Sequence, residues 1–565
     1  MLPYPKNKLA QLVLQHCVVA KIEKVVISPG SRNAPLIIGF ANHPNIETFS
    51  IVDERSAAFF ALGMAQQTRK PVAILCSSGS ALLNYYPAIA EAYYSNIPLV
   101  VLSADRPSYL IDIGDGQTIQ QENVFKNHVL FSANLKEASV NLLKNNTLIQ
   151  KALQISIEQN GPVHINIPFE EPLYETVDSL HRFEFAIEAK QSTVLQNSLL
   201  EEVPLEVEDL QKFADTWNAS AKKMVLLGEN FPDELRQTQL AHIVNDPSVL
   251  VLTETISNVH HKKFISSIDS LIAPLEDDLF KELQPDILLT FGGMVVSKKV
   301  KQFLRKYQPK HHWHVDKKRG QNTYHCLSHH FEISPSLFFS QFFFLTKNAK
   351  STYQKKWLAI KAERDLNRNK FLETVEFSDF KAFDTIIKSL PSHTHLQLSN
   401  SSIIRYSQLF DLPVSSKIFC NRGTSGIDGS TSTAMGASFV VKNQTVFITG
   451  DISFLYDSNG LWNKYVKNNF RIILINNSGG GIFKFIPGPK ISGALPYFET
   501  PHTLNASYLC KMFDFSYASA KNTEDLNLRL KTFYEKGDKP KLLEIFTPTN
   551  KNDVILKSYF NCLKF

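Results

Sequence analysis

Polar side chains follow two neighbouring predicted strands in the last third of the chain. One β-branched run ends in Gly450-Asp451, and the next ends in Asn476-Asn477 before a turn that contains Gly479. Carboxylate and amide oxygens suit Mg²⁺ or Ca²⁺, glycines let a backbone approach a ligand closely, and free amides at a helix start attract phosphate. The spacing therefore indicates a divalent metal ion that holds a diphosphate. Two tight turns with Asp451 as a helix cap are the alternative.

These side chains must be positioned by the strands of a parallel sheet. Strand-like runs alternate with glycine-rich turns and helix-period stretches over residues 20–170 and again from about residue 385. Such alternation predicts parallel, doubly wound sheets, in which ligands bind where strands end and helices begin. The expected strands are residues 24–27, 49–52, 72–76, 99–103, 224–227, 249–252, 287–291, 395–398, 417–420, 446–449, 471–475 and 541–545.

We predict an α/β fold of three domains, each a mostly parallel sheet flanked by helices. A length of 565 residues supports this number, because a domain usually takes about 100–200 residues. The predicted N-terminal domain covers residues 1–180, a linker 181–205 and a central domain 206–345. A helical connector over 346–380 and a C-terminal domain over 381–565 complete the chain.

Composition excludes several function classes. Hydrophobic residues make up 43% and charged residues 20% of the chain, which is typical of a globular protein. The net charge of +6 is too small for a nucleic-acid signature, and neither a signal peptide nor a run of about 18 uncharged apolar residues is present. The six cysteines are scattered without CxxC pairs. We therefore expect a cytoplasmic protein that binds small anions, without nucleic-acid or membrane partners.

The two strand ends together resemble the Gly-Asp…Asn-Asn signature of thiamine-diphosphate enzymes. The resemblance implies that Asp451, Asn477 and the Gly479 carbonyl hold Mg²⁺ or Mn²⁺. It also implies a cofactor between the N-terminal, pyrimidine-binding domain and the C-terminal, diphosphate-binding domain. Further cofactor-binding residues implied by it are Gly79, Ser425, Ile427, Gly450, Ile452, Ser453 and Ile482.

The same resemblance implies a catalytic glutamate that faces the aminopyrimidine ring. Glu54 ends a predicted strand just before a helix, where the family places this residue. A glutamate shielded from water can share a proton with a ring nitrogen of the cofactor. The alternative is that Asp53 or Glu54 only caps the following helix, and we assign that role to Asp53.

Cationic and polar residues also stand at or beside predicted strand ends. Guanidinium groups pair well with carboxylates, and these cations outnumber what one monocarboxylate needs, so two multiply anionic substrates are expected. Each of them taken singly would be a surface charge or a turn anchor. The set comprises Ser31, Arg32, Arg106, Gln117, Lys298, Arg405 and Arg422.

Longer runs narrow the resemblance to one family. SPGSRNAPL, DER, SSGSALLNYYPAIAEA, ADRP, NRGTSGIDG and the Gly-Asp…Asn-Asn pair resemble the 2-succinyl-5-enolpyruvyl-6-hydroxy-3-cyclohexene-1-carboxylate (SEPHCHC) synthases of menaquinone biosynthesis, over residues 20–485. The resemblance implies decarboxylation of 2-oxoglutarate and conjugate addition of the resulting carbanion to isochorismate. It places the cationic set on the substrates, Ile427 under the bent cofactor, and Ile482 and Phe483 along the reaction chamber.

Two departures and two alternatives remain. Gly116 stands where family members often carry Asn, and Gly481 where some carry Gln, which leaves acceptor choice open.

One alternative is another thiamine-diphosphate enzyme, an acetolactate synthase or a 2-oxoacid decarboxylase. The other is a non-catalytic nucleotide-binding or regulatory protein on the same scaffold. The family resemblance further implies a homo-oligomer, either a dimer or a dimer of dimers, with Glu54 from one chain and Asp451 from its partner.

Three further patterns are interpreted as structural. The histidines of 311–314 alternate as in a strand and lack zinc-ligand spacing. The basic run 298–310 fits a solvated helix better than an RNA surface. Gly292-Gly293 lacks the rest of a dinucleotide-binding G-x-G-x-x-G motif, so neither FAD nor NAD is expected.

Overall fold

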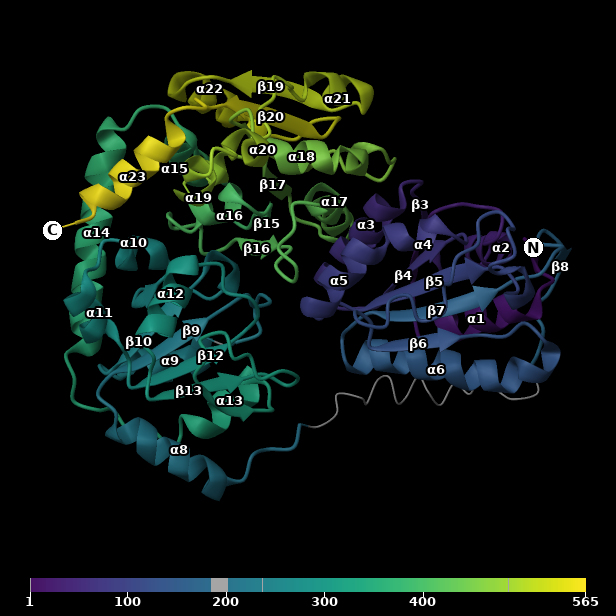
Figure 1. Ribbon diagram of the computed structural model, residues 1–565, viewed down its shortest axis with the longest axis horizontal. Helices are drawn as coiled ribbons and strands as arrows, with labels where there is room; N and C mark the ends of the chain where they lie inside the picture. The colour runs from purple at the N-terminus through teal and green to yellow at the C-terminus, as the bar shows by residue number, and fades with distance from the viewer. Residues whose placement is uncertain (1, 184–201, 236, 486, 565) are drawn as a thin grey trace.

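The computed structural model describes residues 2–183, 202–235, 237–485 and 487–564, and it contains three six-stranded sheets. Every strand pair inside these sheets is parallel. A separate antiparallel pair joins β1 (Tyr4–Pro5) to β8 (Thr176–Val177). Parallel strands need crossover helices, and helices cover the sheets (Figure 1). The predicted fold class is confirmed.

The N-terminal sheet carries helices on both faces. Alternate residues of β4 point to opposite faces, so Ile74 joins one core cluster and Leu75 another. In sheet order the strands are β3 (Glu47–Ser50), β2 (Lys24–Ile27), β4 (Val72–Cys76), β5 (Leu99–Asp105), β7 (Val163–Pro168) and β6 (Phe131–Asn134). The helices are α1 (Lys8–Val19), α2 (Ala34–Ala41), α3 (Glu54–Thr68), α4 (Ser80–Asn84), α5 (Tyr86–Tyr94) and α6 (Leu142–Glu158).

One predicted strand is displaced. The run expected at residues 49–52 forms β3 over Glu47–Ser50 instead. Val52 is 53% exposed, and Asp53 already has the extended backbone and side-chain hydrogen bond of a helix N-cap. The cap of α3 therefore ends the strand two residues earlier than the β-branched pattern indicates.

The middle sheet consists of six short parallel strands. In sheet order they are β11 (Phe264–Ile265), β10 (Val249–Thr253), β9 (Lys223–Leu227), β12 (Ile287–Phe291), β13 (His311–Val315) and β14 (Leu327–Phe331). Its helices are α8 (Val207–Ala219), α9 (Gln237–Asn245), α10 (Ile268–Ile272), α11 (Asp277–Leu283), α12 (Lys298–Lys306) and α13 (Pro335–Phe342). His312 and His314 both hydrogen-bond the Thr290 hydroxyl, at 2.9 and 2.8 Å, so these two imidazoles have a structural partner.

A long helix links the middle and C-terminal sheets. α14 (Tyr353–Thr374) runs along the outer edge of the molecule (Figure 1). Gln354 near its start donates to the Val249 carbonyl of the middle domain, and Arg368 near its end donates to the Leu409 carbonyl of the C-terminal domain. This helix occupies most of the predicted connector 346–380. Most of the predicted linker 181–205 lies outside the described residues, and the domain boundaries stay a prediction.

The C-terminal sheet repeats the architecture of the N-terminal one. In sheet order its strands are β16 (Lys417–Cys420), β15 (His395–Leu398), β17 (Thr445–Gly450), β18 (Phe470–Asn476), β20 (Lys541–Phe546) and β19 (Ser516–Ala520). Its helices are α15 (Asp379–Ser389), α16 (Ser402–Ser407), α17 (Ser430–Val440), α18 (Asp451–Tyr456), α19 (Pro487–Ile491), α20 (Leu495–Glu499), α21 (Ser507–Met512), α22 (Thr523–Phe533) and α23 (Asn552–Cys562).

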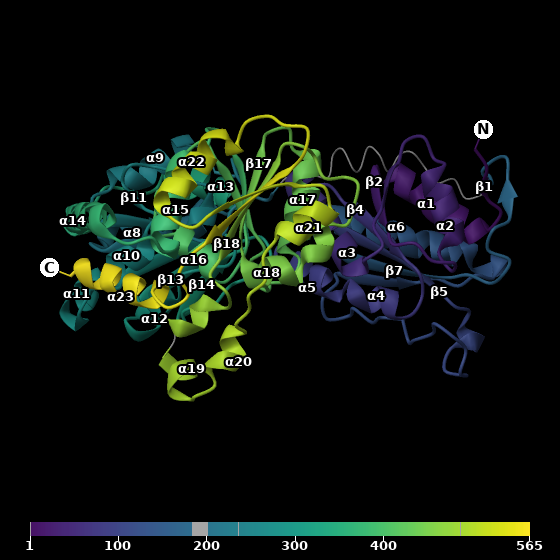
Figure 2. The ribbon, with the colours of Figure 1, turned by 90° about the horizontal axis from the view of Figure 1, so that it is seen from above.

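Helices α3 and α17 join the N-terminal and C-terminal domains. They lie side by side in both views (Figures 1 and 2). A Cβ atom at Gly63 would lie 2.0 Å from the Thr433 carbonyl oxygen, and one at Gly436 would lie 1.9 Å from that of Phe60. Glycine at both positions is therefore required for this close approach, and the two domains share one hydrophobic core.

Candidate functional site

Four neighbouring strands of the C-terminal sheet end at one edge, and each carboxyl end carries a polar candidate residue. The sheet order β16-β15-β17-β18 brings together the segments that follow these strands. Arg422 follows β16, Arg405 lies in α16 after β15, Asp451 follows β17, and Asn477 follows β18. Residues up to 72 positions apart in the sequence thus share one edge, because parallel strands all point the same way.

Asp451 connects the ends of β17 and β18. Its carboxylate is buried and accepts hydrogen bonds from the backbone N–H groups of Ile452, at 2.7 Å, and Gly479, at 2.9 Å. His502 Nε2 lies 3.2 Å from its Oδ2, a contact that the sequence did not indicate. Gly479 has a φ of +150°, and a Cβ there would lie 2.7 Å from the Glu499 carbonyl oxygen. Only glycine fits this turn.

Asn477 presents an amide oxygen that has no partner. Its Nδ2 donates to Oδ2 of Asp379 at 3.0 Å, whereas Oδ1 is buried and has no hydrogen bond in the described part of the chain. A buried polar atom without a partner costs about 1–3 kcal/mol. An oxygen of this kind, next to Asp451 and Gly479, suits a bound cation. Burial raises the pKa of Asp379 to about 6.

The loop before α17 packs against the first turn of α18. Ser453 donates its hydroxyl to the Ile427 carbonyl at 2.8 Å, and the hydroxyl of Ser425 donates to the Arg422 carbonyl at 3.2 Å. The predicted cofactor residues Ser425, Ile427, Ile452 and Ser453 are therefore brought together at one place.

Ile482 and Phe483 lie in a short 3₁₀ turn, η5 (Gly481–Lys484), just beyond Asn477. The Phe483 and Phe498 rings are 5.3 Å apart, so the apolar surface continues into α20. A Cβ at Gly481 would lie 3.0 Å from Asn477 Nδ2, closer than ordinary contact. A larger residue with this backbone conformation would press on the Asn477 amide. Glycine at position 481 avoids this close contact.

Glu54 begins α3 directly after its N-cap, Asp53. Burial, together with the nearby Asp53 charge, raises the pKa of the Glu54 carboxyl. Burial is the main cause of a raised pKa of the Cys76 thiol at the end of β4, and the nearby Glu54 charge is the second cause. The Glu54 carboxyl group therefore lies at the carboxyl edge of the N-terminal sheet. Over the described residues, no hydrogen bond or ion pair joins it to Asp451 or Asn477 of the same chain.

The other N-terminal candidates surround the same edge. The Gly79 backbone N–H, at a φ of +86°, donates to Gln121 Oε1 at 2.8 Å, and a Cβ at Gly79 would lie 3.3 Å from the Gln117 backbone. Arg106 donates to the Gly116 carbonyl at 3.2 Å. These contacts bring Gly79, Arg106 and Gln117 together on the loops that follow β4 and β5.

Arg32 is less accessible than expected for a substrate ligand. It is 4% exposed and donates to the Phe169 carbonyl at 2.7 Å and to Glu171 at 3.3 Å. Its neighbour Ser31 is exposed. The turn that carries both is packed tightly, because a Cβ at Gly30 would lie 2.5 Å from the Ser77 Cβ.

Arg405 and Arg422 face the middle domain. Arg422 donates to Asn400 Oδ1 at 2.6 Å. Burial, together with the Arg422 charge, lowers the pKa of Arg405. The predicted Lys298 is exposed at the start of α12. Lys301, one turn further along, is half-buried; burial lowers its pKa, and the charges of Arg422 and Arg405 lower it further. The sequence analysis missed Lys301, although it lies on the same helix as Lys298.

Comparisons with known proteins identify the family of this chain. Residues 7–129 match the family described as thiamine pyrophosphate enzyme, N-terminal TPP binding domain. Residues 215–398 match the middle domain of thiamine pyrophosphate enzymes. A SEPHCHC synthase of Flavobacterium johnsoniae is 53% identical over 560 residues, with 99% of both chains covered. One of Porphyromonas gingivalis is 37% identical, with 99% of this chain and 97% of the relative covered.

The chain belongs to the SEPHCHC synthase family. The predicted resemblance is confirmed, and the protein is a thiamine-diphosphate-dependent enzyme. Benzoylformate decarboxylase from Polynucleobacter necessarius has the same fold, with a TM-score of 0.69 at 14% identity over 96% of this chain and 99% of that one. No described helix is long and apolar enough to cross a membrane.

In this family member, Glu91 holds the loop that carries Arg422. Glu91 is buried in α5 of the N-terminal domain and accepts hydrogen bonds from the Gly423 N–H at 2.7 Å and from the Thr424 N–H at 2.7 Å. The hydroxyls of Thr424 and Ser95 donate to it at 2.8 Å each. Both carboxylate oxygens are thus occupied by donors, three of which belong to the C-terminal domain.

Replacing Glu91 with Gln is expected to destabilise the protein by about 1–3 kcal/mol, because a side-chain NH₂ would then face a backbone N–H and leave it unpaired. A lower midpoint of urea unfolding would measure this. The control is Glu47→Gln, since Glu47 forms an exposed ion pair with Lys24 and such pairs contribute about 0–1 kcal/mol. Equal midpoints for the two variants would contradict the role of Glu91.

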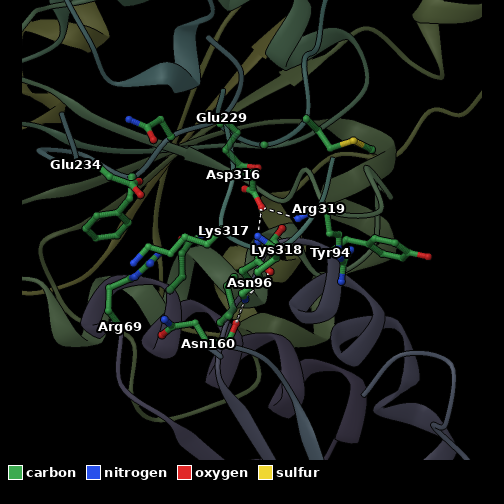
Figure 3. Close-up of a pocket in the computed structure, with 18 of the residues that line it drawn as sticks. Arg69, Tyr94, Asn96, Asn160, Glu229, Glu234, Asp316, Lys317, Lys318 and Arg319 are labelled. Atoms are coloured by element: carbon green, nitrogen blue, oxygen red, sulfur yellow. Dashed lines mark hydrogen bonds between the residues drawn. The ribbon is translucent and has the colours of Figure 1, made fainter. Parts of the chain in front are cut away.

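A cavity of about 470 Å³ lies between the N-terminal and middle domains (Figure 3). Lys318 crosses it to donate to Asn96 Oδ1 at 2.8 Å, and the Arg319 guanidinium lies 5.6 Å from the centre of the Tyr94 ring. None of the predicted cofactor or substrate residues lines this cavity. It is therefore separate from the strand-end site.

Proposed function

We propose that this enzyme decarboxylates 2-oxoglutarate and adds the resulting carbanion to isochorismate, giving 2-succinyl-5-enolpyruvyl-6-hydroxy-3-cyclohexene-1-carboxylate for menaquinone biosynthesis in the cytoplasm. The observation that carries the proposal is the convergence of Arg405 and Arg422 beside Asp451 and Asn477, in a chain 53% identical to a relative of that name. Two guanidinium groups at one edge suit carboxylate-rich substrates. Ser31, Arg32, Arg106, Gln117 and Lys298 are proposed to complete the substrate contacts.

The residues present fit thiamine diphosphate with Mg²⁺ or Mn²⁺. Asp451, the Gly479 carbonyl and the unpaired Oδ1 of Asn477 are the proposed metal ligands, because all three are hard oxygen donors at adjoining strand ends. Ile452 and Ser453 lie in the first turn of α18. The Ser453 backbone N–H would face the diphosphate, and the Ile452 N–H orients Asp451. The other proposed contacts are Gly79, Ser425, Ile427, Gly450 and Ile482.

When bound, thiamine diphosphate supplies a carbon nucleophile and a sink for the electrons released by decarboxylation. The chain itself supplies the acid–base group. Burial raises the pKa of Glu54, which favours a carboxyl that can hold and release a proton next to the aminopyrimidine. Ile427 would support the bent cofactor, and Ile482 and Phe483 would keep water from the reacting atoms.

We infer that the complete site forms between two chains. In the described part of the chain Glu54 makes no hydrogen bond or ion pair with Asp451. Exposed apolar side chains flank both strand edges, as is typical of association surfaces. They are Leu83, Tyr109 and Ile113 near the N-terminal edge and Ile491, Tyr497 and Phe498 near the C-terminal edge. The segment with α19 and α20 stands out from the body (Figure 2), and a dimer or a dimer of dimers would cover it.

The substrate proposal has a direct test. Purified protein with thiamine diphosphate, Mg²⁺, 2-oxoglutarate and isochorismate is expected to yield the SEPHCHC mass, detected by mass spectrometry. Without isochorismate this product cannot form. With pyruvate in place of 2-oxoglutarate, CO₂ release is expected to be much slower, because the cationic residues match dicarboxylates. A preference for pyruvate would instead favour an acetolactate synthase or a 2-oxoacid decarboxylase.

A further inference from the structure

The amide of Asn477 is held from behind by a buried carboxylate. Asp379 is 2% exposed at the first residue of α15, and its Oδ2 accepts the hydrogen bond from Asn477 Nδ2 at 3.0 Å. An asparagine side chain carries its donor and its acceptor on two branches of one planar group. Fixing the donor branch on Asp379 therefore turns the Oδ1 branch to the opposite side, where it has no partner among the described residues.

Asp379 is itself fixed by the segment after β20. Thr547 donates its hydroxyl to Asp379 Oδ1 at 2.6 Å, and the Asp379 backbone N–H donates to Asn552 Oδ1 at 2.9 Å. The Thr549 hydroxyl donates to the Asn477 carbonyl at 3.0 Å. Both Asp379 oxygens thus have protein donors, and the carboxylate lies on the Nδ2 side of Asn477, away from the Oδ1 that would contact a metal ion.

We propose that Asp379 is a positioning residue that keeps the Asn477 amide oxygen turned toward the metal ion, an inference that rests on the proposed cofactor site. A reversed amide would place Oδ1 against Asp379 Oδ2, which loses a hydrogen bond and sets two acceptors against each other. In the orientation shown, the amide dipole is fixed before the metal arrives. Outer partners of this kind usually contribute about 10–100-fold to metal affinity.

The test is a titration of the full chain with Mn²⁺ in the presence of thiamine diphosphate. The electron paramagnetic resonance signal of free Mn²⁺ measures how much of the ion is bound. Asp379→Ala is expected to raise the apparent Kd of Mn²⁺ by about 10–100-fold. Asp379→Asn is expected to raise it less, because one acceptor oxygen remains. The matched control is Asp384→Asn: Asp384 is also buried in α15, but it pairs with Lys388, and its change is expected to leave the Kd as in the wild type.

An exchange of the two side chains separates positioning from a merely structural role. In the double variant Asp379→Asn/Asn477→Asp, the amide at 379 can donate to one oxygen of the carboxylate at 477 and leave the other for the metal. Mn²⁺ affinity is therefore expected to be tighter than in Asn477→Asp alone, where two carboxylates would face each other. If Asp379 contributed only to folding, exchanging the two side chains would not restore Mn²⁺ affinity.

Unchanged Mn²⁺ affinity in Asp379→Asn and Asp379→Ala would overturn the inference, as would a double variant no tighter than Asn477→Asp. If Asp379→Ala does not fold, Asp379→Asn and the double variant still decide. A wild-type protein that binds thiamine diphosphate but no Mn²⁺ would overturn the proposed metal site itself. Failure of that proposal is thus distinguished from failure of the role of Asp379.

Discussion

Turnover of the Glu54→Gln variant is expected to be about 10²–10⁴-fold below that of the wild type, the usual contribution of a positioned acid–base group. Gln keeps the size and polarity of the side chain but cannot exchange a proton. Thiamine-diphosphate affinity should therefore stay close to the wild-type value. Steady-state rates with 2-oxoglutarate and isochorismate, together with calorimetric titration of the cofactor, would measure both quantities.

The neighbouring acid provides a matched control. Asp53→Asn retains a good N-cap for α3, and its turnover is expected to remain near the wild-type rate. Its hydrogen bonds to Ser56 N–H, at 3.0 Å, and Asn459, at 2.8 Å, are structural. Full activity in Glu54→Gln, or an equal loss in both variants, would contradict the assignment of the proton-transfer role to Glu54.

Asp451→Asn is expected to weaken thiamine-diphosphate binding by about 100-fold or more, since even outer partners of a metal contribute about 10–100-fold. The variant removes the charge that we propose pairs with the metal, while its remaining oxygen still accepts from a backbone N–H. Titration of the cofactor with Mg²⁺ and again with a chelator would show this. The variant should no longer respond to Mg²⁺, whereas the wild type should lose affinity when the chelator is added.

Asp457→Asn is the control for the cost of losing a buried acid next to α18. Asp457 caps the other end of that helix and accepts from the Ser432 N–H at 2.7 Å. Its loss is expected to lower stability but to leave the Mg²⁺ response intact. A Mg²⁺ response in Asp451→Asn equal to that of the wild type would remove Asp451 from the metal site.

Mixing these two inactive variants tests whether one site uses two chains. A mixed dimer of Glu54→Gln and Asp451→Asn chains would contain one intact site, so random exchange should restore about a quarter of wild-type activity in a symmetric dimer. If each site forms within a single chain, the mixture stays inactive. The result would thus decide between an inter-chain and an intra-chain cofactor site.

Much of the candidate site could be proposed from the sequence, because strand ends are local features. Asp451 and Asn477 directly follow β-branched runs, and parallel strands bring such ends to one edge of a sheet. The start of α3 shows the limit of that reasoning: the strand before it ends at Ser50, two residues before the predicted end, because the Asp53 cap competes with the β-branched pattern.

Partners from distant segments could not be predicted. Asp379 meets Asn477 across 98 positions of sequence, and Glu91 meets Gly423 across 332. Judged from local sequence, Asp379 is an ordinary negative charge at the start of a helix. Glu91 is likewise an ordinary surface residue of a helix. The sequence analysis chose Lys298 and missed Lys301. Which lysine of this helix is buried depends on the charges and side chains that the neighbouring domain packs against it.

The sequence by itself determined the family, the three-sheet α/β architecture and the residue types at the strand ends, since these depend on alternation and spacing along the chain. Tertiary structure alone decided which groups orient those residues. Hydrogen bonds extend only about 3 Å, so the direction in which Asn477 points is set by what packs behind it. That neighbour, Asp379, arrives from the start of α15.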